Sequence, residues 1–340
     1  SLYLGDNREL YLNSFCKGFR LNSENINHVF VNYLFQSKSY RGYFQITGRG
    51  FTRMNLKQEY VENLLTVLPP IQEQTAIANF LDNKTAKIDK AIAQKEKLIE
   101  LLKERKQILI QNAVTKGLNP NAKMKDSGVE WIGDIPEHWK VVPIRRIVDV
   151  RDGTHDTPVY IEESSNSHFL ITSKDFIENE IDFSNAKSIS KRDFIEISKR
   201  SGVDKGDVIM SMIGGNIGKS VIANSFTEYA IKNVGLFKTY GNIYLSKYIR
   251  YYLQSGLLTV QIEINSRGGA QGFLSLGDLR NLKFFKFPYN EFVSIIDYLE
   301  SQSTKIDKAI ALQQIQIEKL KEYKATLIDS AVTGKIKVTE

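Results

Sequence analysis

The sequence predicts an α+β protein, in which globular domains of mixed strands and helices are joined by two long helices that pair as an antiparallel coiled coil. Two observations predict this fold. A long helical segment is written twice in the chain, and short β-branched and aromatic runs punctuated by glycine pairs lie between the two copies. The 340 residues, 42% of them hydrophobic, are enough to bury sizeable cores without disulfides or metals.

The helical repeat is the strongest signal. Residues 81–115 and 299–333 align without a gap, and the block KIDKAIA at Lys87–Ala93 recurs unchanged at Lys305–Ala311. The shift that carries Lys87 onto Lys305 is called the repeat offset below. Both copies lack glycine and proline and are rich in good helix formers. A helix of about 35 residues would be about 50 Å long, and such a helix needs a partner for its apolar stripe.

Apolar residues in each copy alternate at spacings of three and four, which is a heptad seam. The residues expected to pair are Ile88, Ile92, Ile99, Leu102 and Leu109 in the first copy and Ile306, Ile310, Ile317, Leu320 and Leu327 in the second. Both seams carry polar interruptions at the same two places, Lys95 and Lys106 in one and Gln313 and Lys324 in the other. The alternative is that each helix buries its stripe in its own globular neighbour. Matching seams favour mutual pairing, which is antiparallel if a two-fold axis relates the copies.

The repeat extends upstream of the helices at the same offset, where Arg49-Gly50 meets Arg267-Gly268. Residues 1–70 correspond to 219–288, whereas 121–218 have no counterpart upstream. We therefore expect four regions: 1–70, the C-terminal part of a first domain; 71–120, a helical segment and link; 121–288, a second domain; and 289–340, the closing helical segment. Ser1 is then expected to be an internal start, created by proteolysis or by the choice of the expressed chain.

Charge is divided unevenly. The chain carries a net charge of +7 with a pI near 9.1. Residues 219–288 hold 9 Lys+Arg against 3 Asp+Glu, 1–70 hold 8 against 5, and 121–218 hold 13 against 17. Basic charge is thus concentrated in the trailing part of each domain, which permits binding to nucleic acid.

Several chemistries are excluded by the sequence. A single Cys16 rules out a disulfide framework, and four scattered histidines rule out a Cys/His zinc cluster. No apolar stretch reaches the length of a membrane span, and a reducing cytoplasm fits best. GGNIGKS at Gly214–Ser220 has one residue too few for a phosphate-binding loop and is expected to be a strand-turn-strand. We expect no catalysis, no metal and no cofactor bound by this chain.

Two loops are candidates for contact with DNA. Arg151–Pro158 (RDGTHDTP) presents Arg151, Thr154, His155 and Thr157, which suit base edges and phosphates. The alternative there is an ordinary turn that satisfies its own backbone. The second loop has Arg267 and Gln271 among glycines, with Thr47 and Arg49 at the equivalent place in the first copy; its alternative is a mobile surface loop. Further candidate phosphate contacts are Lys174, Lys219, Lys232 and Lys238.

Across nearly its whole length the chain resembles the specificity (S) subunits of type I restriction-modification systems. The residues that carry the resemblance are LPPIQEQTAIANFLDNKTAKIDKAI (68–92), SGVEWIGDIPEHWKVVPI (127–144), DGTHDTP (152–158), GDVIMSMIGGNIGK (206–219), GGAQGFLSLGDLRNL (268–282) and AVTGKI (331–336). The closing segment departs from the family pattern, since FPYNEFVSIIDYL replaces the LPPIQEQ form.

The resemblance implies two target-recognition domains, each reading one half of a bipartite DNA site, with the paired helices as a spacer. It implies double-stranded DNA, methyltransferase (M) subunits and a restriction/translocase (R) subunit as partners. S-adenosylmethionine, ATP and Mg²⁺ are then expected on those partner subunits. Two other hypotheses compete: a coiled-coil scaffold with no role in DNA binding, and a self-sufficient enzyme, against which the missing catalytic motifs argue.

Overall fold

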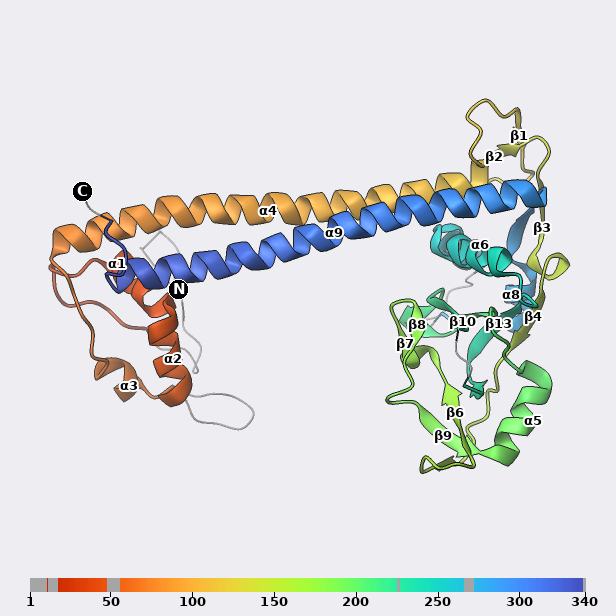
Figure 1. The fold of residues 1–340 in the computed structure, drawn as a ribbon, viewed down its shortest axis with the longest axis horizontal. Helices are drawn as coiled ribbons and strands as arrows, with labels where there is room; N and C mark the ends of the chain where they lie inside the picture. Colours follow the sequence, from red (N-terminus) through yellow and green to blue (C-terminus); the bar gives the residue numbers. More distant parts are fainter. Residues whose placement is uncertain (1–10, 12–17, 48–55, 225–226, 266–271, 339–340) are drawn as a thin grey trace. The chain divides into compact units, whose positions relative to one another are not determined.

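The computed structural model describes residues 11, 18–47, 56–224, 227–265 and 272–338, which form two compact units. The first unit combines the described parts of Ser1–Leu101 and Lys308–Glu340, and the second is Leu102–Asp307. Two long helices, α4 (Ile71–Lys116) and α9 (Tyr289–Val332), contribute residues to both units (Figure 1). The mixture of helices and strands confirms the predicted α+β class.

The first unit is helical in its described part, with three short helices that precede α4: α1 (His28–Gln36), α2 (Lys38–Thr47) and α3 (Gln58–Glu62). Helix α1 begins where Asn27 Oδ1 accepts hydrogen bonds from the backbone N–H groups of Val29 and Phe30, at 2.9 and 3.0 Å. Its buried residues pack against both long helices, and the core formed in this way is Phe30, Tyr33, Leu34, Ile77, Ala78, Leu81, Ile88, Leu327, Ile328, Ala331 and Val332.

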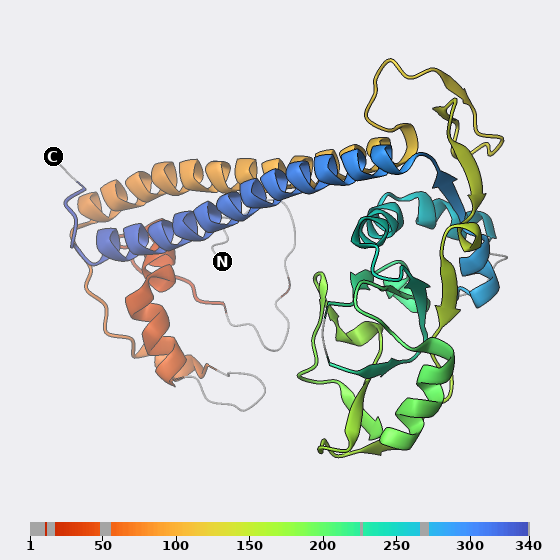
Figure 2. The same cartoon turned by 45° about the vertical axis from the view of Figure 1, so that its right-hand side comes forward.

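Helices α4 and α9 run side by side and antiparallel, as two views show (Figure 1, Figure 2). In the first unit Lys324 Nζ lies 2.6 Å from an oxygen of Asp89, and in the second unit Lys106 Nζ lies 2.6 Å from an oxygen of Asp307. These two ion pairs are repeat equivalents of each other, because the repeat offset carries Lys106 onto Lys324 and Asp89 onto Asp307. The polar seam residues Lys106 and Lys324 thus each pair with an aspartate on the opposite helix.

The predicted seam lies on the covered side of the two helices. Ile88, Ile99, Ile306, Ile317 and Leu327 are at most 9% exposed, and the remaining five residues are half-buried: Ile92, Leu102, Leu109, Ile310 and Leu320. The other two polar seam residues bond each other, since Lys95 Nζ donates to Gln313 Oε1 at 3.1 Å. Supercoiled packing of the two helices stays a prediction.

The helices recur in space as they do in the sequence. Helices α6 (Ile243–Gln254), α7 (Leu257–Asn265) and α8 (Leu276–Asn281) stand in the second unit at the positions that the repeat offset gives to α1, α2 and α3, apart from a few terminal residues. Helix α9 stands in the same way to α4. In each unit the repeated helices pack on the nearby parts of α4 and α9.

The second unit adds two four-stranded sheets. One has the order β11-β10-β13-β4 and is antiparallel throughout, with strands Ser220–Ile222, Val208–Ser211, Val234–Lys238 and Asp149–Asp152. The other has the order β12-β6-β9-β5, with strands Tyr229–Ile231, Ser167–Ile171, Lys187–Ser190 and Tyr160–Ile161. Only β12 and β6 are parallel among these described strands.

Three two-stranded pairs complete the described strands: β1 (Met124–Asp126) with β2 (Asp134–Pro136), β3 (Lys140–Pro143) with β14 (Lys283–Lys286), and β7 (Phe176–Ile177) with β8 (Glu180–Ile181). Three 3-10 turns, η1 (Ile144–Arg146), η2 (Ser173–Asp175) and η3 (Gly214–Asn216), connect strands. The η3 turn joins β10 to β11, which are antiparallel neighbours, so the predicted strand-turn-strand is confirmed and no phosphate-binding loop precedes a helix.

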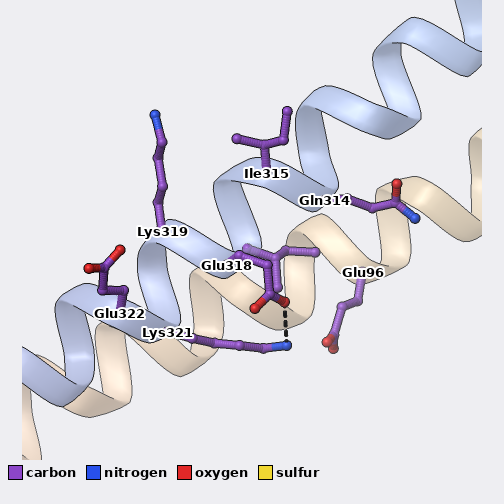
Figure 3. A pocket seen from close by; sticks show the side chains of 8 residues that line it. Glu96, Gln314, Ile315, Glu318, Lys319, Lys321 and Glu322 are labelled. Atoms are coloured by element: carbon purple, nitrogen blue, oxygen red, sulfur yellow. Dashed lines mark hydrogen bonds and ion pairs between the residues drawn. The ribbon is translucent and has the colours of Figure 1, made fainter.

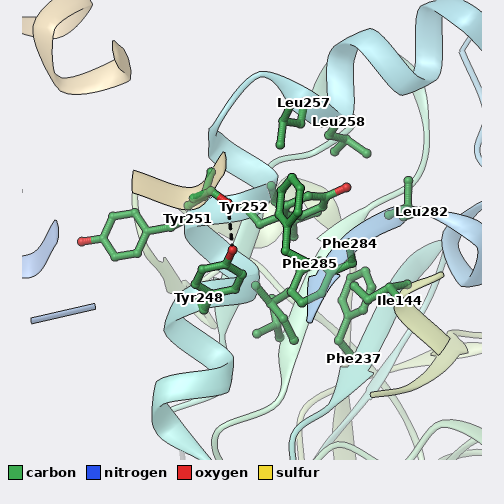
Figure 4. Packing of buried hydrophobic residues seen from close by; sticks show 14 of the residues in the cluster. Ile144, Phe237, Tyr248, Tyr251, Tyr252, Leu257, Leu258, Leu282, Phe284 and Phe285 are labelled. Carbon is green, nitrogen blue, oxygen red and sulfur yellow. Dashed lines mark hydrogen bonds between the residues drawn. The ribbon is translucent and has the colours of Figure 1, made fainter. Parts of the chain in front are cut away.

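The largest core of the second unit lies between the sheet region and the helices. Trp139 is fully buried there; its ring stacks on Phe287 with centroids 4.0 Å apart, and its indole N–H donates to Glu291 Oε1 at 3.1 Å. Figure 4 shows the aromatic residues of α6 beside those of β14, and the Tyr252 and Phe284 ring centroids are 4.7 Å apart. Tyr248 Oη donates to the carbonyl oxygen of Val114 on α4 at 3.0 Å, so this core includes the end of the first long helix.

Helix α5 (Lys191–Ser201) covers the second sheet. Its Ser190 cap accepts a hydrogen bond from Asp193 N at 3.1 Å, and Phe194 and Ile197 pack on Leu170 and Ala230 of the sheet. The opposite side of β12 faces a separate apolar cluster between the sheets. Successive side chains of β12 therefore point into different cores: Ala230 toward α5, and Tyr229 and Ile231 toward the cluster between the sheets.

Candidate nucleic-acid interface

The predicted DNA-contacting loop, Arg151–Pro158, leaves the end of β4 and is anchored by Asp152. That carboxylate is 4% exposed and accepts hydrogen bonds from two cationic or polar groups, Arg200 Nη2 of α5 and His155 Nε2, the latter at 3.0 Å. A buried carboxylate needs such partners because its desolvation is costly. The loop is thus held by a charge network and not only by its own turn.

Gly153 is required by a close approach of two backbones. A Cβ atom at this position would lie 2.4 Å from the carbonyl oxygen of Ile231, which no side chain permits. The approach lets Thr154 N donate to Ile231 O at 3.0 Å and Asn233 N donate to Thr154 O at 3.1 Å. The loop backbone is therefore fixed onto the segment after β12.

The outer face of the loop is formed by residues that keep polar atoms near solvent. The His155 side chain is 47% exposed, with Nδ1 3.0 Å from Asn233 Oδ1 and its ring edge-on to Phe273 at 6.4 Å between centroids. Phe273 is 55% exposed, although its backbone pairs with Ile213. An exposed aromatic ring next to a held imidazole suits contact with bases.

The four candidate lysines differ in burial. For two of them, Lys232 and Lys238, the predicted phosphate contact is wrong. Lys238 is 3% exposed and its Nζ lies 2.5 Å from oxygens of both Asp204 and Asp207. Lys232 is 8% exposed and donates to Thr157 Oγ1. Neither ammonium is available to a phosphate, because each is buried against acceptors of the chain itself.

Lys219 and Lys174 lie nearer to solvent. Lys219 is exposed, yet its Nζ donates to the carbonyl oxygen of Phe176 at 2.5 Å. Lys174 is an exposed residue of the η2 turn, whose cap is Thr172. Both remain candidate phosphate contacts.

Arg151 is not a free cation. Its Nε and Nη2 each lie 2.8 Å from Asp149 Oδ2, and the side chain is 33% exposed. Burial alone would lower the pKa of Arg151, but the hydrogen bonds and charges of Asp149 and Tyr240 outweigh it and hold the pKa above its ordinary value. The guanidinium stays charged, but DNA would have to compete with Asp149 for it.

The second predicted loop lies mostly outside the part of the chain that the structure describes. Arg49, Arg267 and Gln271 all fall outside the described residues, and Thr47 is known only as the last residue of α2. Their proposed role in DNA binding is unchanged.

Sequence reasoning missed Arg200, Asn233 and Phe273. Arg200 is separated from Asp152 by 48 residues and Asn233 from His155 by 78 residues, so no local motif joins them. Asn233 has a positive φ of 56°, a conformation in which asparagine is enriched. Such a strained turn has no clear signal in a single sequence.

A shallow groove between α4 and α9 in the first unit is the other surface of note. It is lined by Glu96, Gln314, Ile315, Ile317, Glu318, Lys319, Lys321 and Glu322, and Lys321 Nζ lies 2.9 Å from Glu318 Oε1 (Figure 3). Charges of both signs alternate there around an isoleucine that is 54% exposed. The mixture fits contact with a protein better than contact with phosphates.

Within the described residues, no group of three or more His, Cys, Asp or Glu side chains could hold a metal ion. Among the described helices none is long and apolar enough to cross a membrane.

Comparison with known proteins agrees with the architecture. A family described as the type I restriction modification DNA specificity domain matches residues 2–101. The MjaVIII type I specificity subunit of Methanocaldococcus jannaschii is 27% identical over 315 residues, covering 90% of this chain and 70% of that protein. The EcoBI specificity subunit of Escherichia coli is 24% identical over 270 residues, covering 76% of this chain and 56% of that protein.

Solved structures share the fold. A chain from work on complex assembly and conformational transition of the type I R-M system superposes with a TM-score of 0.71 at 17% identity, covering 93% of this chain and 74% of that one. The HsdS subunit from Thermoanaerobacter tengcongensis superposes with a TM-score of 0.53 at 17% identity, covering 92% and 72%.

Fold and matches together point to one class, the DNA specificity subunits of type I restriction-modification systems. The chain is similar over most of its length to type I restriction enzyme specificity subunits, and its residues 2–101 match the model of the type I restriction modification DNA specificity domain. A coiled-coil scaffold with no role in DNA binding is not favoured by these matches.

Proposed function

We propose that the domain spanning residues 121–288 reads one half of a bipartite DNA site, and that residues 1–70 are the trailing part of a second reader. In this proposal α4 and α9 set the separation of the half-sites and dock methyltransferase subunits. S-adenosylmethionine, ATP and Mg²⁺ act on the partner M and R subunits and not on this chain.

The observation that carries the proposal is the construction of the Arg151–Pro158 loop. Asp152 holds the loop from within, between Arg200 and His155, so that the exposed imidazole keeps its position beside the Phe273 ring. A reader of base edges needs such preorganised side chains, because each ordering step otherwise costs affinity. Phosphate contacts would come from the exposed candidates Lys174 and Lys219 and from Arg49 and Arg267.

The role of the loop is tested with His155→Ala in the methyltransferase complex that contains this chain. We expect specific DNA binding to weaken about tenfold, which lies within the range of about 1–3 kcal/mol for a base-reading contact. Gel shifts at several salt concentrations measure it, and the slope with salt should not change because no phosphate contact is lost. His28→Ala, at the exposed start of α1, is the matched control. Equal affinity and site discrimination in both variants would remove the loop from the proposed interface.

The spacer role is tested by inserting one heptad into both α4 and α9. Helix α4 has 46 residues and is about 70 Å long, and a heptad in each helix keeps the seam while lengthening the pair by about 10 Å. Sequencing of methylated sites should then show a half-site spacer longer by about three base pairs, at about 3.4 Å per base pair. An unaltered spacer in an active complex contradicts the spacer role.

A further inference from the structure

The segment between α3 and α4 presents an apolar surface in the first unit, although it belongs to no helix or strand (Figure 1). Leu65 is 93% exposed, Val67 is 83% exposed and Leu68 is 42% exposed. The backbone N–H groups of residues 65–68 donate to no described residue. Free backbone groups beside apolar side chains invite pairing with another strand, and proteins usually cover or charge such segments.

The equivalent segment of the second unit is covered, so the molecule itself shows what fits this surface. The repeat offset carries residues 65–68 onto β14, in which Phe284 and Phe285 are buried. Strand β14 pairs along its length with the antiparallel β3. Just before β3 comes Trp139, whose buried ring packs on Phe285 with centroids 5.6 Å apart. In the second copy the cover is therefore a strand preceded by a tryptophan.

The carboxylate that holds this tryptophan is present in both copies. Glu291 Oε1 accepts from the Trp139 indole N–H at 3.1 Å, and Glu291 Oε2 lies 2.7 Å from His138 Nε2. The repeat offset carries Glu73 onto Glu291. Glu73 is exposed and bonds no described residue. The first unit thus keeps the acceptor for a His-Trp pair, at the start of the helix that follows the open segment.

We propose that residues 64–70 and Glu73 form an acceptor site for an extended segment of a separate polypeptide, in which a His-Trp pair precedes a strand that contains valines. The strand pairs with residues 65–68 as β3 pairs with β14, and the indole and the imidazole bond the Glu73 carboxylate. Backbone hydrogen bonds supply affinity in strand addition of this kind, and the side-chain contacts supply specificity.

The segment of this chain that has the required chemistry is already engaged. Trp139 and β3 belong to the second unit, where the indole is fully buried and β3 is paired with β14. A second copy of the chain would have to open the same core to supply its strand. Strand β14 also offers two phenylalanine rings, whereas the first unit offers Thr66 and Val67 at those places. A separate polypeptide with a free segment binds without that cost.

The probe for the test is a fluorescent peptide with the sequence of residues 131–144, WIGDIPEHWKVVPI, titrated with the full chain. We expect saturable binding by fluorescence polarisation. Segment-resolved hydrogen exchange should show that the peptide protects the amides of residues 65–68. A peptide with Trp139→Ala should bind at least about thirtyfold more weakly, which is the loss typical of a tryptophan at the centre of an interface.

Two variants of the full chain test the acceptor side. Val67→Asp should weaken peptide binding at least about tenfold, because a charge would then face the apolar strand. Glu73→Gln should weaken it about tenfold, because the charged acceptor is lost. Leu312→Asp, at an apolar residue of α9 that is 57% exposed, is the control. All three residues are exposed, so the variants should fold as the wild type does.

Absence of peptide binding, or binding that Val67→Asp and Glu73→Gln leave unchanged, overturns the proposal. Protection at β14 in place of residues 65–68 also overturns it, because the peptide would then be exchanging with β3. Light scattering of the full chain alone checks a second copy as the occupant: a dimer that Val67→Asp dissociates would overturn the assignment to a separate polypeptide. The test uses no DNA, so its failure would leave the proposed function standing.

Discussion

The two copies of the repeated helical module are built alike where they meet the long helices and differ where they face away from them. In the first unit Tyr33 Oη bonds Asp82 at 2.7 Å and Thr85 at 3.0 Å. In the second unit Tyr251 Oη bonds Glu300 at 2.9 Å, and these two residues are the repeat equivalents of Tyr33 and Asp82. Burial raises the pKa of both tyrosines to about 12.

The copies diverge at the residues that flank α3 and α8. Phe285 of β14 is 1% exposed, whereas its repeat equivalent Val67 is 83% exposed; Leu274 is 5% exposed and its equivalent Leu56 is 39% exposed. In the second unit β14 pairs with β3, and β3 follows Trp139. The contacts with the long helices thus recur in both copies, whereas among the described residues this segment is buried in the copy where β14 pairs with β3.

The largest effect is expected from Trp139→Ala, which removes a residue of the core that buries β14 in the second unit. Loss of a fully buried indole that stacks on Phe287 should lower the free energy of unfolding of the second unit by about 3–5 kcal/mol. Hydrogen exchange resolved by segment should show α6 and β14 opening while α1 keeps its protection. Ile46→Ala, at a residue that is 85% exposed, is the control. Equal loss of protection in α1 and α6 would contradict the independence of the two copies.

A smaller, pH-dependent effect is expected at Asp329, which has no acidic equivalent because Gln111 stands at that place in α4. Burial alone would raise the pKa of Asp329, but hydrogen bonds from Lys335 and Ser39 outweigh it and hold the pKa below the ordinary 3.8. The carboxylate therefore stabilises the first unit above about pH 4, and this stabilisation is lost as the pH falls through the folded-state pKa.

Asp329→Asn should remove this contribution, which is about 1.5–3 kcal/mol for hydrogen bonds to a charged group. Denaturant unfolding at several pH values checks the expectation: the difference between wild type and variant should be full at pH 7 and shrink in acid. Gln111→Ala in the second unit should give a difference that does not depend on pH. A variant whose deficit persists unchanged below pH 3 would show that the carboxylate charge is not the cause.

The smallest effects are expected from Tyr33→Phe and Tyr251→Phe. Each removes a hydroxyl that bonds a carboxylate still reached by water, Asp82 or Glu300, so each should cost only about 0.5–1.5 kcal/mol, and the two values should agree because the contacts are repeated. Thermal unfolding of the two variants beside Tyr289→Phe, an exposed tyrosine, gives the comparison. Values that differ by more than about 1 kcal/mol would mean that the repeated geometry hides unequal surroundings.

Periodicity could predict the helices because their signals are local. The stripe through Ile88, Ile99 and Ile317 identified the long helices, although α4 and α9 begin about ten residues before the aligned repeat. Sheet order could not be predicted, since β12 and β6 pair although several other strands lie between them in the sequence, and no local pattern specifies that pairing. Lys238 shows the limit at the site: its burial depends on Asp207, 31 residues upstream, so its sequence neighbourhood was compatible with a surface cation.

The hydrogen bond between Lys95 and Gln313 bears on whether two copies of this chain could pair through their α4 helices. These residues are repeat equivalents, so an antiparallel pair of two α4 helices from separate chains, in the same register, would bring two Lys95 ammonium groups together. Like charges at such a distance repel each other, whereas the amide oxygen of Gln313 accepts the proton that Lys95 donates. The replacement of Lys95 by Gln313 in the second copy therefore disfavours the homotypic dimer and favours the pairing within one chain.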